Sequence, residues 1–246
     1  MVVNAAVGVA NQVRSAVFGF VSSFQTAFNP QIVKLYALEE KDQLLLLIYR
    51  SSKFSYYLLF IISFPIVLFC KEVLSIWLVN VPDYAVVITQ LVIITSFTEA
   101  LSAPLWTAIG ATGKVQKYQL LVSLIIFLNV PLVYVAFKLG MSPIAAFVIN
   151  FVVSVFAYLY RLLYIKKYVP YHLGDYLKKV VLPCVIVTVL SFPIPYIFRE
   201  YAISAISTIL LLVLTIVVTG IVILLTGLDM NEKRFLISKI KKVIKK

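Results

Sequence analysis

Residues 1–30 of the chain read MVVNAAVGVANQVRSAVFGFVSSFQTAFNP. The stretch is long enough to cross a bilayer as one helix, yet ten of its residues are polar. At about 3.6 residues per turn, these side chains gather on one side of the helix. We call this set the polar stripe. Its centre is Asn4, Asn11, Ser15, Ser22, Thr26 and Asn29, with Gln12 and Ser23 along one edge and Arg14 and Gln25 along the other.

The other side of the same helix is apolar and suits lipid or apolar helices. A helix with one polar face, in a chain this apolar, must turn that face to a water-filled cavity or a protein interior. We therefore expect the remaining segments to form the walls of such a cavity. The apolar side carries Val2, Val9, Val13, Val17, Phe20, Phe24 and Phe28.

The composition places the chain among membrane proteins. Hydrophobic residues make up 62% of the 246, and the mean hydropathy is +1.03, more than a soluble domain of this size can bury. The net charge of +12 lies between the apolar runs, which is typical of membrane topology and not of nucleic-acid binding. Cys70 and Cys184 lie far apart and neither has a CxxC partner, and His172 lies in a predicted connecting loop, so we expect no disulfide, metal site or cofactor.

Seven segments have a length and composition suited to crossing a membrane, which predicts an all-α polytopic fold. Between the first two, the charged stretch 34–53 should lie in water. Gly110, Gly113, Gly140 and Pro143 mark turns between later segments. The seven segments are 2–28, 54–78, 84–110, 117–138, 142–163, 178–198 and 202–227.

Lysine and arginine alternate between the connections of these segments. One set of connections and the C-terminal tail carry 18 of them, whereas the other set carries 3. The rich side is predicted to be cytoplasmic, which puts the C-terminus inside and the N-terminus outside a bacterial inner membrane. Because such a start without a signal peptide is unusual, we expect further residues upstream of Met1.

The tail, 228–246, is predicted to be a basic amphipathic helix on the anionic inner leaflet. Asp229 and Glu232 are spaced like a helix N-cap and its third-position partner. The apolar side of this helix would consist of Leu236, Ile237, Ile240, Val243 and Ile244.

Two charged residues lie inside predicted spans. Arg14 costs at least about 2.5 kcal/mol near mid-membrane, so it should face a cavity or a carboxylate. In a cavity its planar guanidinium would bind a phosphate or pyrophosphate, and otherwise it would pair with another helix. Glu99 is either a proton or cation site or the partner of Arg14. Asn129 and Asn150 more simply predict a hydrogen bond between helices.

Motifs of soluble enzymes are missing, and we expect no enzymatic activity. The glycines of 110–114 lack the spacing of a phosphate-binding loop and follow no predicted strand. The sequence instead indicates transport across a membrane.

Several short motifs, in this order and spacing, resemble the C-terminal half of Wzx-type polysaccharide (O-antigen) flippases. That family belongs to a superfamily with the MATE drug exporters and the lipid II flippase. The motifs are residues 3–13, 28–32, 76–78 with Val81 and Pro82, 103–105, 108–114 with Tyr118 and Gln119, 131–134, 138–140 and 160–162.

The resemblance implies two six-helix bundles around a central cavity, followed by two further helices. Residues 1–163 would then be part of the second bundle, and 164–227 the additional pair. The rest of the transporter, an N-terminal bundle on the same or a separate chain, would be a partner alongside membrane lipids.

Flippases of this family move undecaprenyl-pyrophosphate-linked oligosaccharides to the outer leaflet by alternating access. By resemblance, Arg14 would contact the headgroup of this lipid-linked oligosaccharide. Side chains of the polar stripe would bind its sugar hydroxyls, namely Asn4, Asn11, Gln12, Ser15, Ser22 and Gln25.

Three alternatives remain open at this stage. A MATE-like multidrug antiporter would use Glu99 as the coupling carboxylate and Arg14 as its partner. A polytopic polysaccharide polymerase would carry long outward loops, whereas the predicted ones are short. A scaffold without transport activity is the third.

Overall fold

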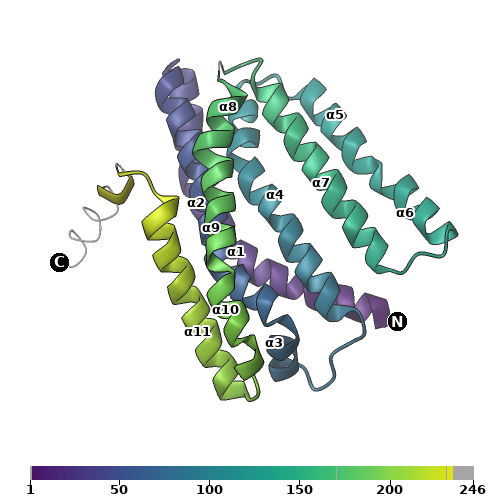
Figure 1. Cartoon of the computed structure of the whole chain (residues 1–246). Coiled ribbons are helices and arrows are strands. Elements are labelled where there is room, and N and C mark those ends of the chain that lie inside the picture. Colours follow the sequence, from purple (N-terminus) through teal and green to yellow (C-terminus); the bar gives the residue numbers. More distant parts are fainter. Residues whose placement is uncertain (1, 170, 231, 235–246) are drawn as a thin grey trace.

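The computed structural model describes residues 2–169, 171–230 and 232–234, and within them every regular element is a helix. This confirms the predicted all-α class. The helices run between two ends of the molecule (Figure 1). They are α1 Val2–Ala37, α2 Lys41–Leu68, α3 Cys70–Trp77, α4 Ala85–Ala111, α5 Gln116–Phe127, α6 Asn129–Lys138, α7 Ile144–Ile165, α8 Leu173–Tyr176, α9 Leu182–Ser191, α10 Pro193–Ile197 and α11 Ala205–Val222, with π-helical turns Leu177–Val181 and Ile223–Gly227 and a 3-10 turn Phe198–Tyr201.

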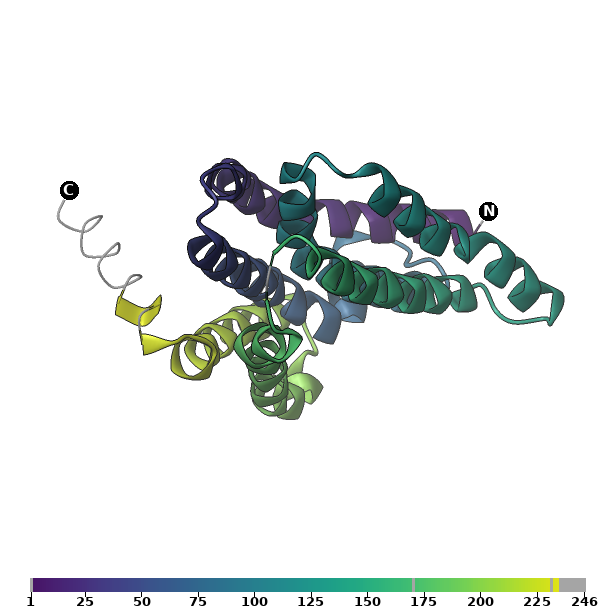
Figure 2. The ribbon, with the colours of Figure 1, turned by 90° about the horizontal axis from the view of Figure 1, so that it is seen from above.

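Helix α4 lies at the centre and packs against α1, α2 and α7. Seen from above, α5 to α7 lie on one side of the molecule, whereas α9 to α11 lie beside α2 on the other (Figure 2). One large cluster of buried apolar side chains joins both parts, from Phe60 and Leu105 to Leu162, Val187 and Leu211. The core therefore continues across the predicted boundary between 163 and 164.

Six helical segments of the described chain are long and apolar enough to cross a membrane, and five of them coincide with a predicted span. The predicted span 54–78 is wrong in its bounds: α2 begins at Lys41 and ends at Leu68, and the rest of the prediction is the separate helix α3. Helix α1 is 36 residues long, roughly 54 Å at 1.5 Å per residue, but its polar stripe keeps it out of this set. The six segments are Lys41–Leu68, Ala85–Ala111, Gln116–Lys138, Ile144–Ile165, Leu173–Tyr201 and Ala205–Gly227.

The prediction that 34–53 lies in water is wrong for its second half. Helix α2 begins at Lys41, and Leu44 and Ile48 are buried one turn apart. Side chains four residues apart on a helix lie on the same face, and this face of α2 packs into the main core. Lys53, the last charge of the stretch, is only 2% exposed.

Prolines account for the breaks inside two predicted spans. Span 117–138 is interrupted at Leu128 because Pro131 has no N–H to bond Phe127 and its ring crowds the preceding turn. Span 178–198 is interrupted at Phe192, directly before Pro193. Gly113 and Gly140 have φ of 68° and 75°, which confirms the turns predicted there.

Lys53 is held in the interior by acidic residues that follow the last span. Its Nζ lies 2.7 Å from Glu232 Oε2 and 3.8 Å from Asp229 Oδ2. Glu232 Oε2 also accepts the Asp229 backbone N–H at 2.9 Å, which is the helix-capping contact predicted from their spacing. The apolar positions predicted for the tail, from Leu236 to Ile244, lie outside the described residues.

Replacing Lys53 by Met leaves the Glu232 carboxylate buried without its partner. We expect Lys53→Met to lower the free energy of unfolding by about 3 kcal/mol, and the double variant Lys53→Met/Glu232→Gln to recover most of this loss. Thermal unfolding in detergent can be followed by reaction of a thiol-sensitive dye with Cys70 and Cys184, which are free and buried. Equal losses in the single and double variants would contradict this account.

Two helices end in the same way but with different residues. After α1 the N–H groups of Glu39 and Glu40 bond the carbonyls of Tyr36 and Leu35, at 3.1 Å each. After α6 the N–H groups of Gly140 and Met141 make the equivalent pair of bonds. This is the Schellman motif, whose C′ residue has positive φ. Glu39 adopts φ 57° with a side chain that disfavours it.

The matched positions give opposite predictions. We expect Glu39→Gly to raise the free energy of unfolding by about 1 kcal/mol through relief of this strain, and Gly140→Ala to lower it by a similar amount. The same thermal assay measures both. A loss of stability in Glu39→Gly would show that the Glu39 side chain contributes more than its backbone costs.

Candidate functional site: the polar stripe of α1

Helix α1 packs along the side next to the polar stripe, not along the stripe itself. Its buried side packs against α4 and α2. Small residues at Ala6 and Ala10 allow the N-terminal half to approach Cys70, Leu74, Ala85 and Ile88 closely. The buried residues are Ala6, Ala10, Val17, Val21, Gln25 and Ile32.

The polar stripe faces away from the described part of the chain. This corrects the expectation that the remaining segments wall it in, because the packed side of α1 is rotated away from the stripe. Only local contacts are made there: the hydroxyls of Ser23 and Thr26 donate to carbonyls one turn back in α1. The exposed members are Asn4, Asn11, Gln12, Ser15, Ser22, Ser23 and Thr26.

One edge of the stripe and the last residue of its centre, Asn29, are bonded to α4. Gln25 is buried and donates to the Ala100 carbonyl at 3.1 Å, so it joins two helices and does not line the exposed face. The Asn29 amide oxygen accepts from the Thr107 hydroxyl at 2.9 Å. These bonds fix the rotation of α1 and keep the stripe turned outward.

Arg14 and Glu99, 85 residues apart in sequence, form an ion pair at this edge. Arg14 Nη2 lies 2.5 Å from Glu99 Oε2, and Arg14 Nε donates to Ser96 Oγ at 3.2 Å. The Ser96 hydroxyl itself donates to the Val92 carbonyl, which leaves its oxygen to accept from Arg14. The guanidinium also lies 5.4 Å from the centre of the Phe18 ring.

The ion pair remains open on its outer side. The Arg14 and Glu99 side chains are 33% and 42% exposed, and no hydrogen bond of Arg14 Nη1 is found within the described residues. An anion approaching from the stripe can therefore reach unused N–H donors of the guanidinium. The sequence left Arg14 either in a cavity or in an ion pair, and the structure shows the ion pair, with the guanidinium partly exposed.

The hydrogen-bond partners of α1 on α4 could have been found in the sequence. Ser96, Glu99 and Thr107 lie three and eleven residues apart, which places them on one face of a helix. The predicted Asn129–Asn150 contact is confirmed: Asn129 Nδ2 donates to Asn150 Oδ1 at 3.3 Å, between α6 and α7.

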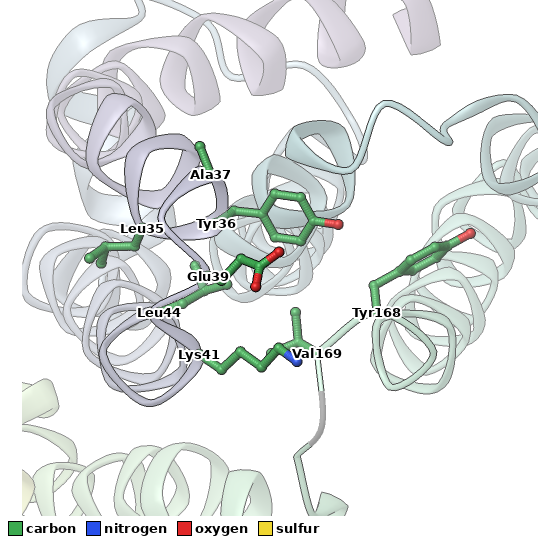
Figure 3. A pocket seen from close by; sticks show the side chains of 8 residues that line it. All are labelled: Leu35, Tyr36, Ala37, Glu39, Lys41, Leu44, Tyr168 and Val169. Carbon is green, nitrogen blue, oxygen red and sulfur yellow. The ribbon is translucent and has the colours of Figure 1, made fainter.

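A separate cavity of about 380 Å³ lies between the α1–α2 turn and the segment after α7 (Figure 3). Tyr36, Glu39 and Lys41 approach it from the side opposite Tyr168. Tyr171 anchors this segment by donating to the Leu162 carbonyl, and burial raises the pKa of its hydroxyl, which keeps it protonated. Because Glu39 and Lys41 carry opposite charges, this cavity selects neither anions nor cations.

Comparison with protein-family models, with curated proteins and with solved structures gives no match. The class rests on the chain itself, with its six apolar helical segments of membrane-spanning length. The chain is a multi-pass helical membrane protein, and in such a protein an exposed polar stripe is the strongest indication of a functional surface.

The stripe should be reached by water even when the protein is in a bilayer. Single cysteines at Ser15 and Ser22, in a Cys70→Ala/Cys184→Ala background, should react with a membrane-impermeant thiol reagent at least about 10-fold faster than a cysteine at Phe20. Phe20 is 64% exposed on the apolar side of α1, so it serves as the lipid-facing control. Equal rates at the three positions would mean that the stripe is not hydrated.

Proposed function

We propose that this chain is the C-terminal part of a polysaccharide transporter. It would flip undecaprenyl-pyrophosphate-linked oligosaccharides across the bacterial inner membrane by alternating access. The observation that carries the proposal is the outward-facing polar stripe of α1, with the half-exposed Arg14 at its edge.

Hydration is the first step of the argument. Amide and hydroxyl groups lose their hydrogen bonds in hydrocarbon, at a cost of several kcal/mol for each unsatisfied group. The stripe must therefore border water or a second polar helical body. Between two bodies it would line a path through the membrane, because it follows α1 from Asn4 to Asn29.

The chemistry of the stripe suits a substrate with one anionic group and many hydroxyls. Arg14 offers a planar donor pair to a pyrophosphate, while Asn11, Gln12 and Ser15 offer neutral donors and acceptors to sugar hydroxyls. The resemblance to Wzx-type flippases supports the same substrate. It also implies that the body covering the stripe would be an N-terminal helical bundle, on the same or a separate chain.

The test is export of lipid-linked oligosaccharide by cells that make the whole transporter. We expect Arg14→Ala to lower export about 10- to 100-fold, since it removes charge-assisted hydrogen bonds to the pyrophosphate, and Arg14→Lys to retain part of it. Arg199→Ala is the matched control, because Arg199 lies in the 3-10 turn away from the stripe. Normal surface polysaccharide in Arg14→Ala would refute the proposal.

The Arg14–Glu99 contact also favours a second candidate, a cation-coupled antiporter. There Glu99 would bind the coupling proton or cation when it leaves Arg14, and Glu99→Gln should abolish transport driven by an ion gradient. In the flippase, Glu99→Gln removes a competitor for Arg14 and should strengthen binding of the pyrophosphate lipid. Measuring gradient-driven transport and lipid binding in this one variant separates the two functions.

A further inference from the structure

At the C-terminal end of the polar stripe, α1 meets α4 and α5 around a cavity of about 550 Å³. This lies within the range of roughly 300–1,000 Å³ typical of small-molecule sites. Two glycines, two amides and an indole line it, and none of its lining residues is charged. The lining residues are Asn29, Val33, Trp106, Thr107, Gly110, Ala111, Gly113, Val115 and Gln119.

Trp106 supplies a flat apolar surface to this cavity. Its side chain is 54% exposed, and the structure contains no hydrogen bond to its indole N–H within the described residues. Trp side chains normally combine apolar contact with a bonded N–H. An occupant with an apolar ring face and a hydrogen-bond acceptor would provide the apolar contact and also bond the indole N–H.

The amides point to the same kind of occupant. The Asn29 oxygen lies 2.9 Å from the Thr107 hydroxyl, which also bonds the Ala103 carbonyl at 3.1 Å. No hydrogen bond of the Asn29 amide nitrogen is found within the described residues, so this nitrogen is available to donate to an occupant. Gln119 is exposed on α5 and adds a second amide. A Cβ added to Gly110 or Gly113 would have no other atom within 4 Å. The space beside these two glycines is therefore open, and an occupant can approach the backbone between Trp106 and Gln119.

We propose that this cavity binds a neutral sugar ring, whose apolar face lies on Trp106 and whose hydroxyls bond Asn29 and Gln119. The proposal rests on the proposed function and adds a second recognition site to it. Arg14 lies 15 residues before Asn29, roughly 22 Å along the helix at 1.5 Å per residue. The pyrophosphate, with the first sugars beside it, and a sugar further along the same substrate would thus be recognised at separate places on α1.

Binding can be measured on the full chain in nanodiscs through Trp106 fluorescence. The chain has two Trp residues, so Trp77→Phe leaves Trp106 as the only reporter. The probes are undecaprenyl pyrophosphate without a sugar and the same lipid carrying a chain of glucose, galactose or N-acetylglucosamine units that is long enough to reach from Arg14 to Trp106. We expect at least one sugar-bearing lipid to change Trp106 emission and to bind about 10-fold more tightly than the sugar-free lipid.

Gly110→Val places a side chain in the cavity and so tests the site. It removes no contact within the fold and creates no clash at Cβ, since a Cβ at Gly110 would have no other atom within 4 Å. It should abolish the 10-fold gain and leave the affinity of the sugar-free lipid unchanged. Gly174→Val is the matched control, at another helical glycine whose Cβ position is open, and should leave both affinities unchanged.

The outcomes separate this proposal from the transporter itself. If all four lipids bind with equal affinity, the sugar site is wrong and the proposed function stands. If no lipid binds, both are wrong. Quenching of Trp106 by brominated phospholipids, without any response to sugar-bearing lipids, would identify Trp106 as a contact to membrane lipid and overturn the sugar site.

Discussion

A polar group in hydrocarbon must find its partners within the protein, and α1 meets only part of this requirement. Its edge is satisfied by α4 through Ser96, Glu99 and Ala100. Apart from Asn29, which bonds Thr107, its centre has no such partners among the described residues, because the helices that follow pack beside it. The rest of the arrangement follows from this. Helix α4 is central because it both bonds the edge of α1 and joins the apolar helices on either side, and the stripe becomes the boundary between this body and water or another helical body.

On the opposite side of the molecule, a buried charge finds its partners within the protein. Lys53 is a full charge in the interior of α2, but Glu232 and Asp229 reach it from beyond the last span. Tyr57 adds a bond of 2.8 Å to the Gly227 carbonyl, and a Cβ at Gly227 would lie only 2.8 Å from that hydroxyl. Breaking one partner of a buried ion pair is costly, whereas an exposed pair contributes little. The Lys53 contacts therefore stabilise the fold, and the half-exposed Arg14–Glu99 pair is better suited to exchange partners.

The sequence predicted features that depend on neighbours along the chain. The stripe on α1, the six apolar spans and the turns at Gly113 and Gly140 all follow from helical periodicity and local backbone preference. Features set by distant residues were not predictable in the same way. Lys53 looked like a residue of a charged loop because its partner Glu232 lies 179 residues away. Likewise, the position of the stripe on α1 was evident, but the side of α1 that packs was decided by Ala6, Ala10 and their neighbours on α3 and α4.

Both candidate functions require the Arg14–Glu99 ion pair to separate, and they differ in which of the two residues stays in place. In a flippase the pyrophosphate replaces Glu99 beside Arg14, whereas in an antiporter a proton or cation replaces Arg14 beside Glu99. Arg14 keeps Ser96 and the ring of Phe18 when Glu99 leaves. Glu99 has no second hydrogen-bond partner in the described part of the chain. A group held by several contacts stays oriented when one is lost, and preorganised donors bind an incoming anion with little further cost. The arrangement therefore favours Arg14 as the fixed member of the pair and exchange of anions at its outer face.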